Sequence, residues 1–88
     1  MSKYIYPAIF TKEKNGYSVN FPDVDGCFTC GATLAEAIEM ASDALSLMIA
    51  DYEETGTEIP TATTISHLVL NNNEFAKLIT GETSIYKR

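Results

Sequence analysis

The 88 residues include twelve acidic and six basic side chains, which gives a formal charge of −6 and a pI of about 4.5, and 45% of the residues are apolar. This length and composition predict one small globular domain, and no apolar run is long enough for a membrane span or a signal peptide. The few scattered bases disfavour nucleic-acid binding, which relies on clustered Lys and Arg, whereas an acidic surface favours a basic protein partner. We therefore expect a soluble, cytoplasmic, protein-binding domain.

The first elements in chain order are predicted to form a β-hairpin. Residues 4–11 are rich in aromatic and β-branched side chains, and residues 17–21 alternate apolar with polar positions, as in a strand with one buried face. Asn15-Gly16 lies between them and is a strong hairpin signal, because both residues tolerate a positive φ. Pro7 cannot donate a ladder hydrogen bond, so we expect it at an outer edge or a bulge.

A short third strand over residues 27–31 and a long helix over residues 34–54 are predicted next. Thr33 and Glu36 form a capping-box pattern, in which the hydroxyl accepts the amide proton of Glu36 and the carboxylate accepts that of Thr33. Gly56 is expected to end the helix in the left-handed conformation. The apolar stripe expected to cover the sheet consists of Leu34, Ala37, Ile38, Ala41, Leu45, Met48, Ile49 and Tyr52.

The last third of the chain is predicted to add one more strand. Residues 64–70 fit either a strand or a single helical turn, because short apolar runs match both periods. Residues 75–80 predict the last strand, closed by Gly81. The order is then β-β-β-α-β, with residues 64–70 unassigned. This order predicts an α+β fold, in which one long helix covers a small, mostly antiparallel sheet.

Cys27 and Cys30 have the C-x-x-C spacing found in redox and zinc sites. A redox pair needs its first thiol at a helix N-terminus. The predicted strand instead places the two cysteines ahead of the helix and on opposite faces. A structural zinc site needs four ligands, and the only histidine, His67, is distant in sequence and has no evident catalytic partner. We interpret both cysteines as ordinary reduced thiols and expect no metal and no cofactor.

A metal-dependent nuclease is the enzymatic alternative. Its chemistry needs several carboxylates that converge on two ions from different elements. Residues 4–11 contain no Asp or Glu, and Asp23 and Asp25 lie in a predicted turn. The helical acids are interpreted as a solvated face: Glu36, Glu39, Asp43, Glu53 and Glu54. The sequence therefore predicts no catalytic site and no enzymatic activity.

Met40 and Leu47 are apolar residues on a predicted helix face opposite the main stripe, which they share with Glu36, Asp43 and Ala50. Isolated exposed apolar residues are common on protein surfaces. The alternative is a contact with a second subunit or a partner. Because the sheet also has open edge strands, we expect a homodimer and select Met40 and Leu47 as its self-association residues.

The segment from Tyr17 to Ala37 carries the pattern YxVxFPDxxGCxTxGxTxxEA and resembles the HicB-type antitoxins. The resemblance is strong over residues 4–60 and weaker over residues 61–88. It implies a partial ribonuclease H-like fold without the nuclease carboxylates, and a protein that binds and occludes a small basic RNA-cleaving toxin of the HicA type. Full-length members of that family usually also carry a C-terminal ribbon-helix-helix or helix-turn-helix domain that binds DNA. We expect residues 1–88 to be a single domain without it, so operator binding is not assigned to these residues.

The toxin-binding patch is predicted at the acidic turn with Asp23 and Asp25 and at the adjoining Phe28. An aromatic anchor beside charges is typical of interface hot spots. The alternative is an ordinary turn that closes the sheet. Two other functions also remain open. One is a stand-alone interaction domain with another partner, and the other is a divergent metal-dependent nuclease, which has only fold analogy behind it.

Overall fold

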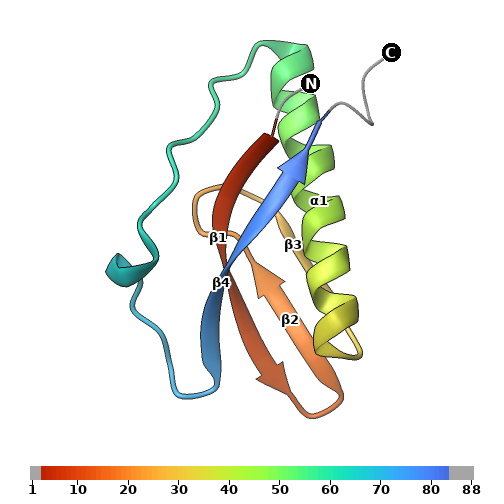
Figure 1. Ribbon diagram of the computed structural model, residues 1–88, viewed down its shortest axis with the longest axis vertical. Helices are drawn as coiled ribbons and strands as arrows, with labels where there is room; N and C mark the ends of the chain where they lie inside the picture. The colour runs from red at the N-terminus through yellow and green to blue at the C-terminus, as the bar shows by residue number, and fades with distance from the viewer. Residues whose placement is uncertain (1–2, 84–88) are drawn as a thin grey trace.

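The computed structural model describes residues 3–83 and contains a four-stranded sheet with one long helix (Figure 1). The elements in chain order are β1 (Lys3–Glu13), β2 (Gly16–Asn20), β3 (Phe28–Gly31), α1 (Leu34–Thr55), the 3₁₀ helix η1 (Ile65–His67) and β4 (Glu74–Glu82). The strand order is β3-β2-β1-β4, and every neighbouring pair is antiparallel. The predicted α+β fold with order β-β-β-α-β is confirmed, and the undecided residues 64–70 contain a single helical turn.

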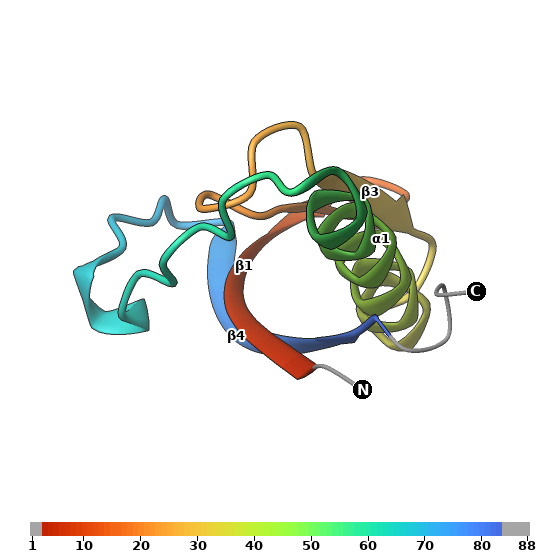
Figure 2. The same cartoon turned by 90° about the horizontal axis from the view of Figure 1, so that it is seen from above.

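The sheet is strongly curved, and α1 packs on its concave side. Seen from above, β1 and β4 form an arc on one side of the molecule while α1 lies on the other, near β3 (Figure 2). Both edge strands, β3 and β4, contact the helix. The segment that carries η1 passes outside the arc, on the far side of the sheet from α1 (Figure 2). The helix therefore fills the space between the two sheet edges.

The hairpin turn lies where the sequence predicted it, but its conformation differs. Lys14 and Asn15 are the two turn residues, because Glu13 pairs with Gly16. No non-glycine residue in the described range has a positive φ, so the expected positive φ at Asn15 is wrong. Gly16 alone in this turn has one, of 152°, and a Cβ there would lie 2.4 Å from the carbonyl oxygen of Gly31. Glycine is therefore required at position 16 for two reasons: it adopts the positive φ, and it lets β3 approach closely.

Pro7 lies in β1, an interior strand of the sheet, at a place where only one neighbour pairs with it. The ladder between β1 and β2 runs from Ile9 to Glu13, whereas the ladder between β1 and β4 covers Pro7, which faces Leu78. The segment around Pro7 therefore has no strand on its other side. Proline is tolerated there because a missing amide proton interrupts no ladder on the unpaired side. Pro7 therefore has the predicted edge environment, although β1 is an interior strand of the sheet.

The helix has the predicted ends, with one change in the capping contacts. The Thr33 hydroxyl accepts the amide proton of Glu36 at 3.1 Å, as expected. The Glu36 carboxylate accepts from the amide of Ala32 at 2.6 Å, so the expected bond to the Thr33 amide is wrong by one residue. Gly56 closes the helix at φ 75°, and its amide donates to the carbonyl of Tyr52. Both ends of α1 are therefore fixed by local side-chain and backbone contacts.

The core lies between the concave face of the sheet and α1. It includes Tyr6, Ala8, Phe10, Val19, Phe21, Ala37, Ala41, Leu45, Ile49 and Ile79. Three helical positions differ from the predicted pattern. Leu34 is 36% exposed, whereas Ala50, placed on the exposed face, and Ser46 are buried. The buried arc of the helix is wider than the predicted stripe, because α1 is flanked by two sheet edges and not by one flat face.

Within the described part of the chain, no helix is both long enough and apolar enough to cross a membrane.

Candidate functional site

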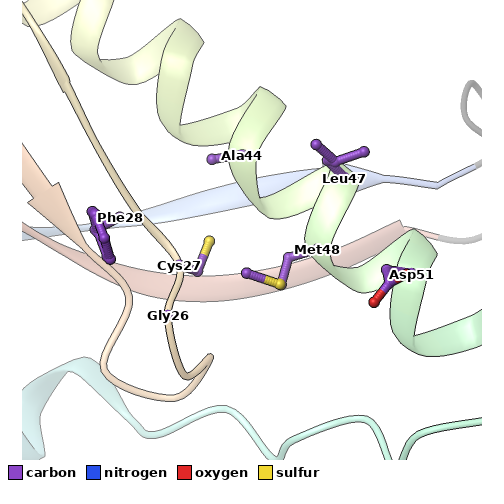
Figure 3. A pocket seen from close by; sticks show the side chains of 7 residues that line it. All are labelled: Gly26, Cys27, Phe28, Ala44, Leu47, Met48 and Asp51. Atoms are coloured by element: carbon purple, nitrogen blue, oxygen red, sulfur yellow. The ribbon is translucent and has the colours of Figure 1, made fainter.

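A pocket opens between the start of β3 and the middle of α1. Its volume is about 350 Å³. It is lined by Gly26, Cys27, Phe28, Ala44, Leu47, Met48 and Asp51 (Figure 3). Figure 3 shows Ala44 and Met48 projecting from the helix toward the segment that carries Cys27 and Phe28, with Asp51 one turn further along.

The helical wall of the pocket follows from residue spacing. Ala44, Leu47, Met48 and Asp51 stand at positions i, i+3, i+4 and i+7, which share one face of a helix. On this face Ala44 and Met48 are partly buried against the core, whereas Leu47 and Asp51 are exposed. The stripe therefore presents three apolar side chains, followed by one carboxylate, to the edge where β3 begins.

The other wall is held by a tight loop ahead of β3. The amide of Val24 donates to the carbonyl of Phe21 at 3.2 Å, and the amide of Cys27 donates to the carbonyl of Val24 at 3.1 Å. The amide of Phe21 in turn donates to the carbonyl of Cys27 at 3.1 Å, which closes the loop. Gly26 has φ 77°, a left-handed conformation that favours glycine. These contacts fix the position of Phe28 at the pocket.

The pocket is apolar with one acidic residue. Phe28 is 70% exposed and Leu47 is 59% exposed, so both are available to a partner. The Cys27 thiol is buried, and burial raises its pKa to about 11, so it stays neutral and is a poor nucleophile at physiological pH. Asp51 is the only charged side chain of the lining. The arrangement suits contact with an apolar or amphipathic group.

Two residues predicted for different roles lie together in this pocket. Phe28 was selected as a toxin contact and Leu47 as a self-association residue, and both line the same cavity. Met40, the other self-association residue, is 43% exposed but lies outside the lining. Phe28 and Leu47 therefore belong to one pocket, and Met40 does not.

The two acids of the predicted patch have different surroundings. The Asp23 carboxylate is half-buried and accepts hydrogen bonds from the Thr63 amide at 2.8 Å and from the Thr63 hydroxyl at 2.5 Å. Nearby, the Tyr6 hydroxyl donates to the carbonyl of Pro60; burial, and then the charge of Asp23, raise the pKa of Tyr6. Asp23 therefore ties the segment after α1 to the turn, whereas Asp25 is exposed.

The other candidate side chains are not gathered into a site. Cys27, just ahead of β3, is buried, whereas Cys30, on β3, is exposed. His67 is exposed at the end of η1. Among residues 3–83, no three side chains of His, Cys, Asp or Glu lie close enough to hold a metal ion.

The basic residues are unevenly distributed over the molecule. No Lys or Arg occurs between Lys14 and Lys77, a stretch that carries ten of the twelve acidic residues and runs from the hairpin turn through β2, β3, α1 and the segment after the helix into the start of β4. The basic residues of the described range lie on β1, in the hairpin turn and on β4: Lys3, Lys12, Lys14 and Lys77. The pocket therefore lies in a region without cations.

The sequence-based prediction missed five of the seven lining residues: Gly26, Cys27, Ala44, Met48 and Asp51. Helical spacing could have grouped Ala44 and Asp51 with Leu47. It could not show which end of β3 lies beside that face, because this depends on how the helix crosses the sheet.

Comparisons with known proteins show the family of the chain. The sequence profile of the family described as HicB_like antitoxin of bacterial toxin-antitoxin system matches residues 6–86. The chain is 43% identical to Antitoxin HicB 2 of Photorhabdus laumondii over 65 residues, which cover 73% of this chain and 47% of that protein.

Two solved structures share the fold. One is a toxin–antitoxin complex from Streptococcus pneumoniae, with a TM-score of 0.88 and 26% identity, covering 97% of this chain and 73% of that one. The other is a HicA3 and HicB3 toxin–antitoxin complex, with a TM-score of 0.71 and 24% identity, covering 86% of this chain and 95% of that one. The chain spans about half the length of the first curated relatives it matches. On the profile match, which extends over nearly all of the described residues, the chain belongs to the HicB-like antitoxin family.

Proposed function

We propose that this chain is the toxin-binding domain of an antitoxin from a type II toxin–antitoxin pair. Its partner is a small basic RNA-cleaving protein of the HicA type. The observation that carries the proposal is the exposed apolar pair Phe28 and Leu47, set in a region rich in acids and free of Lys and Arg. Membership of the antitoxin family and the fold shared with a toxin–antitoxin complex support it.

The proposed mechanism is occlusion and not catalysis. The domain covers the RNA-binding surface of the toxin and excludes the substrate, so one antitoxin neutralises one toxin. An interface of standard size would bury about 800 Å² on each partner. The acidic surface speeds encounter with a basic toxin, because opposite net charges steer association. The domain itself needs no cofactor for this role, and it acts in the cytoplasm, where the toxin meets RNA.

Within the predicted patch, we assign direct contact to Asp25 and Phe28. Both are exposed, Asp25 in the loop before β3 and Phe28 at the first position of β3. Asp23 has a different role in the proposal: its carboxylate is engaged by Thr63, so it holds the loop in place while Asp25 and Phe28 meet the toxin.

Co-expression with the small basic protein encoded beside this gene tests the proposal. The expected result is growth rescue together with co-purification of both proteins. The matched control is the Lys77→Ala variant, which changes an exposed residue on β4 and should rescue as the wild type does. A folded wild-type chain that neither rescues growth nor co-purifies would contradict the proposal, and would favour a stand-alone interaction domain with another partner. Mg²⁺-dependent RNA cleavage by the isolated chain would favour the nuclease instead.

We also propose that the chain forms a homodimer. Met40 is 43% exposed on α1, outside the pocket, and is the self-association residue that leaves the pocket open. Leu47, selected for the same contact, lines the pocket, so a dimer that buries it would compete with the toxin. Light scattering after size exclusion should give twice the chain mass for the wild type and a single chain mass for Met40→Asp. A monomeric wild type would contradict the dimer.

A further inference from the structure

We infer that the pocket between β3 and α1 receives one long basic side chain, Lys or Arg, from the partner protein. This inference rests on the proposed function and specifies how the partner docks. The aliphatic stem of that side chain would pack on Leu47 and Met48, and its cation would lie beside Asp51.

The size of the pocket fits a single side chain. Its volume of about 350 Å³ is near the lower end of the roughly 300–1,000 Å³ range of small-ligand pockets. It is bounded by a loop fixed by three backbone hydrogen bonds on one side and by a helix on the other. Because one wall is a helix and the other is a hydrogen-bonded loop, we expect the pocket to be preformed.

The lining matches the two ends of a basic side chain. Lys and Arg bury their methylene stems on apolar surface while the charged head stays near water. Ala44, Leu47 and Met48 supply the apolar surface, and Met adapts to irregular shapes. Asp51 is exposed at one end of the row and supplies the carboxylate. The exposed ring of Phe28 offers a face to a guanidinium or ammonium group.

The electrostatic surroundings favour a cation over a neutral guest. Glu54 stands one turn from Asp51 on α1, and α1 itself contains no Lys or Arg. A cation entering the pocket meets no like charge on the helix or on β3, and it gains from the carboxylate at the rim. An acidic partner would meet repulsion from the same groups.

The other exposed apolar surface is less suited to a basic partner. Ile5 and Leu78 are 55% and 60% exposed and share the sheet face directed away from α1, since Leu78 pairs with Pro7 and the side chains alternate. Lys3 lies on this face opposite Glu82, whereas Lys77 pairs with Ala8 and so lies on the face toward α1. This face therefore carries charges of both signs, and the pocket, whose only charged lining residue is Asp51, is better suited to a cation.

Calorimetric titration of the full chain with the small basic protein encoded beside the gene tests the inference with two matched pairs. Leu47→Ala is compared with Leu78→Ala, because the two leucines are 59% and 60% exposed on opposite sides of the molecule. Asp51→Asn is compared with Asp43→Asn, because both acids are exposed on α1 and only Asp51 lines the pocket. All four residues are exposed, so thermal unfolding should be unchanged.

We expect Leu47→Ala to weaken binding about tenfold, as for an interface hot spot, and Leu78→Ala to leave it unchanged. Asp51→Asn should weaken binding about fivefold and lower its salt dependence, since a charge-assisted contact is lost. Asp43→Asn should change affinity by less than about twofold.

The outcomes separate the two proposals. A wild-type chain that forms no complex overturns the proposed function, and the inference falls with it. If the wild type forms a complex and both Leu47→Ala and Asp51→Asn bind with the wild-type affinity, the inference is overturned and the proposed function stands. Loss of binding in Leu78→Ala with retention in Leu47→Ala would place the toxin on the open sheet face and also overturn it.

Discussion

The carboxylate of Asp23 accepts two hydrogen bonds from Thr63, which lies 40 residues further along the chain. One comes from the amide and the other from the hydroxyl, so each carboxylate oxygen has a partner from the same residue. The segment after α1 has no regular structure before η1, and this contact holds it against the loop that precedes β3. Asp23 therefore connects the loop that forms one wall of the pocket to the segment between α1 and η1.

The first prediction follows from this link. Asp23→Ala should lower the free energy of unfolding by about 2 kcal/mol, because two hydrogen bonds to a half-buried carboxylate are lost. Asp25→Ala is the matched control and should change it by less than about 0.5 kcal/mol, since Asp25 is exposed. Urea unfolding followed by circular dichroism measures both. Equal stability of the two variants would contradict the structural role of Asp23.

The same contact changes how the acidic patch should be tested for binding. A double substitution, Asp23→Lys with Asp25→Lys, would be the direct charge reversal, but its first half also removes the bonds to Thr63. Asp25→Lys alone keeps them. We expect this single variant to unfold like the wild type and to bind the toxin about tenfold more weakly, as for a hot-spot residue. Unchanged affinity in calorimetry would remove Asp25 from the interface.

The elements of the fold could be predicted because their signals are local. The period-2 pattern of β2, the Thr33 cap and Gly56 each specify a short stretch of chain, and all three stand where expected. Ser46 could not be predicted as buried, because its hydroxyl meets β4, which is far away in sequence, at the amide of Glu82. The pocket was missed for the same reason: Phe28 and Leu47 meet only through the packing of α1 against β3.

Ser46 provides the second prediction, since its hydroxyl connects the helix to β4. It donates to the carbonyl of Ser42 at 2.7 Å and accepts from the amide of Glu82 at 2.9 Å. Ser46→Ala removes the buried serine hydroxyl that accepts from this partly buried amide, so we expect a loss of about 1–2 kcal/mol. Thr55→Ala is a control for an exposed helical hydroxyl that also bonds a backbone carbonyl. A loss in Ser46→Ala no larger than in this control would contradict the role of Ser46.

Gly31 provides the third prediction, because the start of the helix lies directly against it. A Cβ at Gly31 would lie 2.5 Å from the amide nitrogen and 2.7 Å from the Cα of Ala37. These are backbone atoms near the N-terminus of α1, and they cannot move without displacing the helix. Gly31→Ala should therefore cost about 2 kcal/mol or more, as for overpacking in a close contact.

Gly56→Ala is the matched comparison for Gly31→Ala. Nothing lies within 4 Å of a Cβ at Gly56, and only its φ of 75° opposes a side chain. This conformation should cost about 1 kcal/mol. Thermal unfolding of both variants gives the order, and a Gly31→Ala protein as stable as Gly56→Ala would show that β3 and α1 can separate at little cost.

The fourth prediction concerns the two thiols, which differ in burial. Cys27 is 2% exposed, and burial raises its pKa from 9.0 to about 11, whereas Cys30 is exposed. The thiolate is the reactive form, so iodoacetamide at pH 8 should modify Cys30 and leave Cys27 intact in the folded protein. Mass spectrometry of the digested protein measures this, and Cys30→Ser is the control that should take up no label.

The same pKa contributes to the pH dependence of stability at alkaline pH. Between pH 9 and 11 the unfolded chain loses the Cys27 proton while the folded chain keeps it, so the free energy of unfolding falls as the pH rises through this window. The slope from this one group is at most about 1.4 kcal/mol per pH unit. Cys27→Ala has no thiol to titrate and should show a flatter profile over the same range. Parallel profiles for the wild type and this variant would show that the buried thiol is not what links stability to pH here.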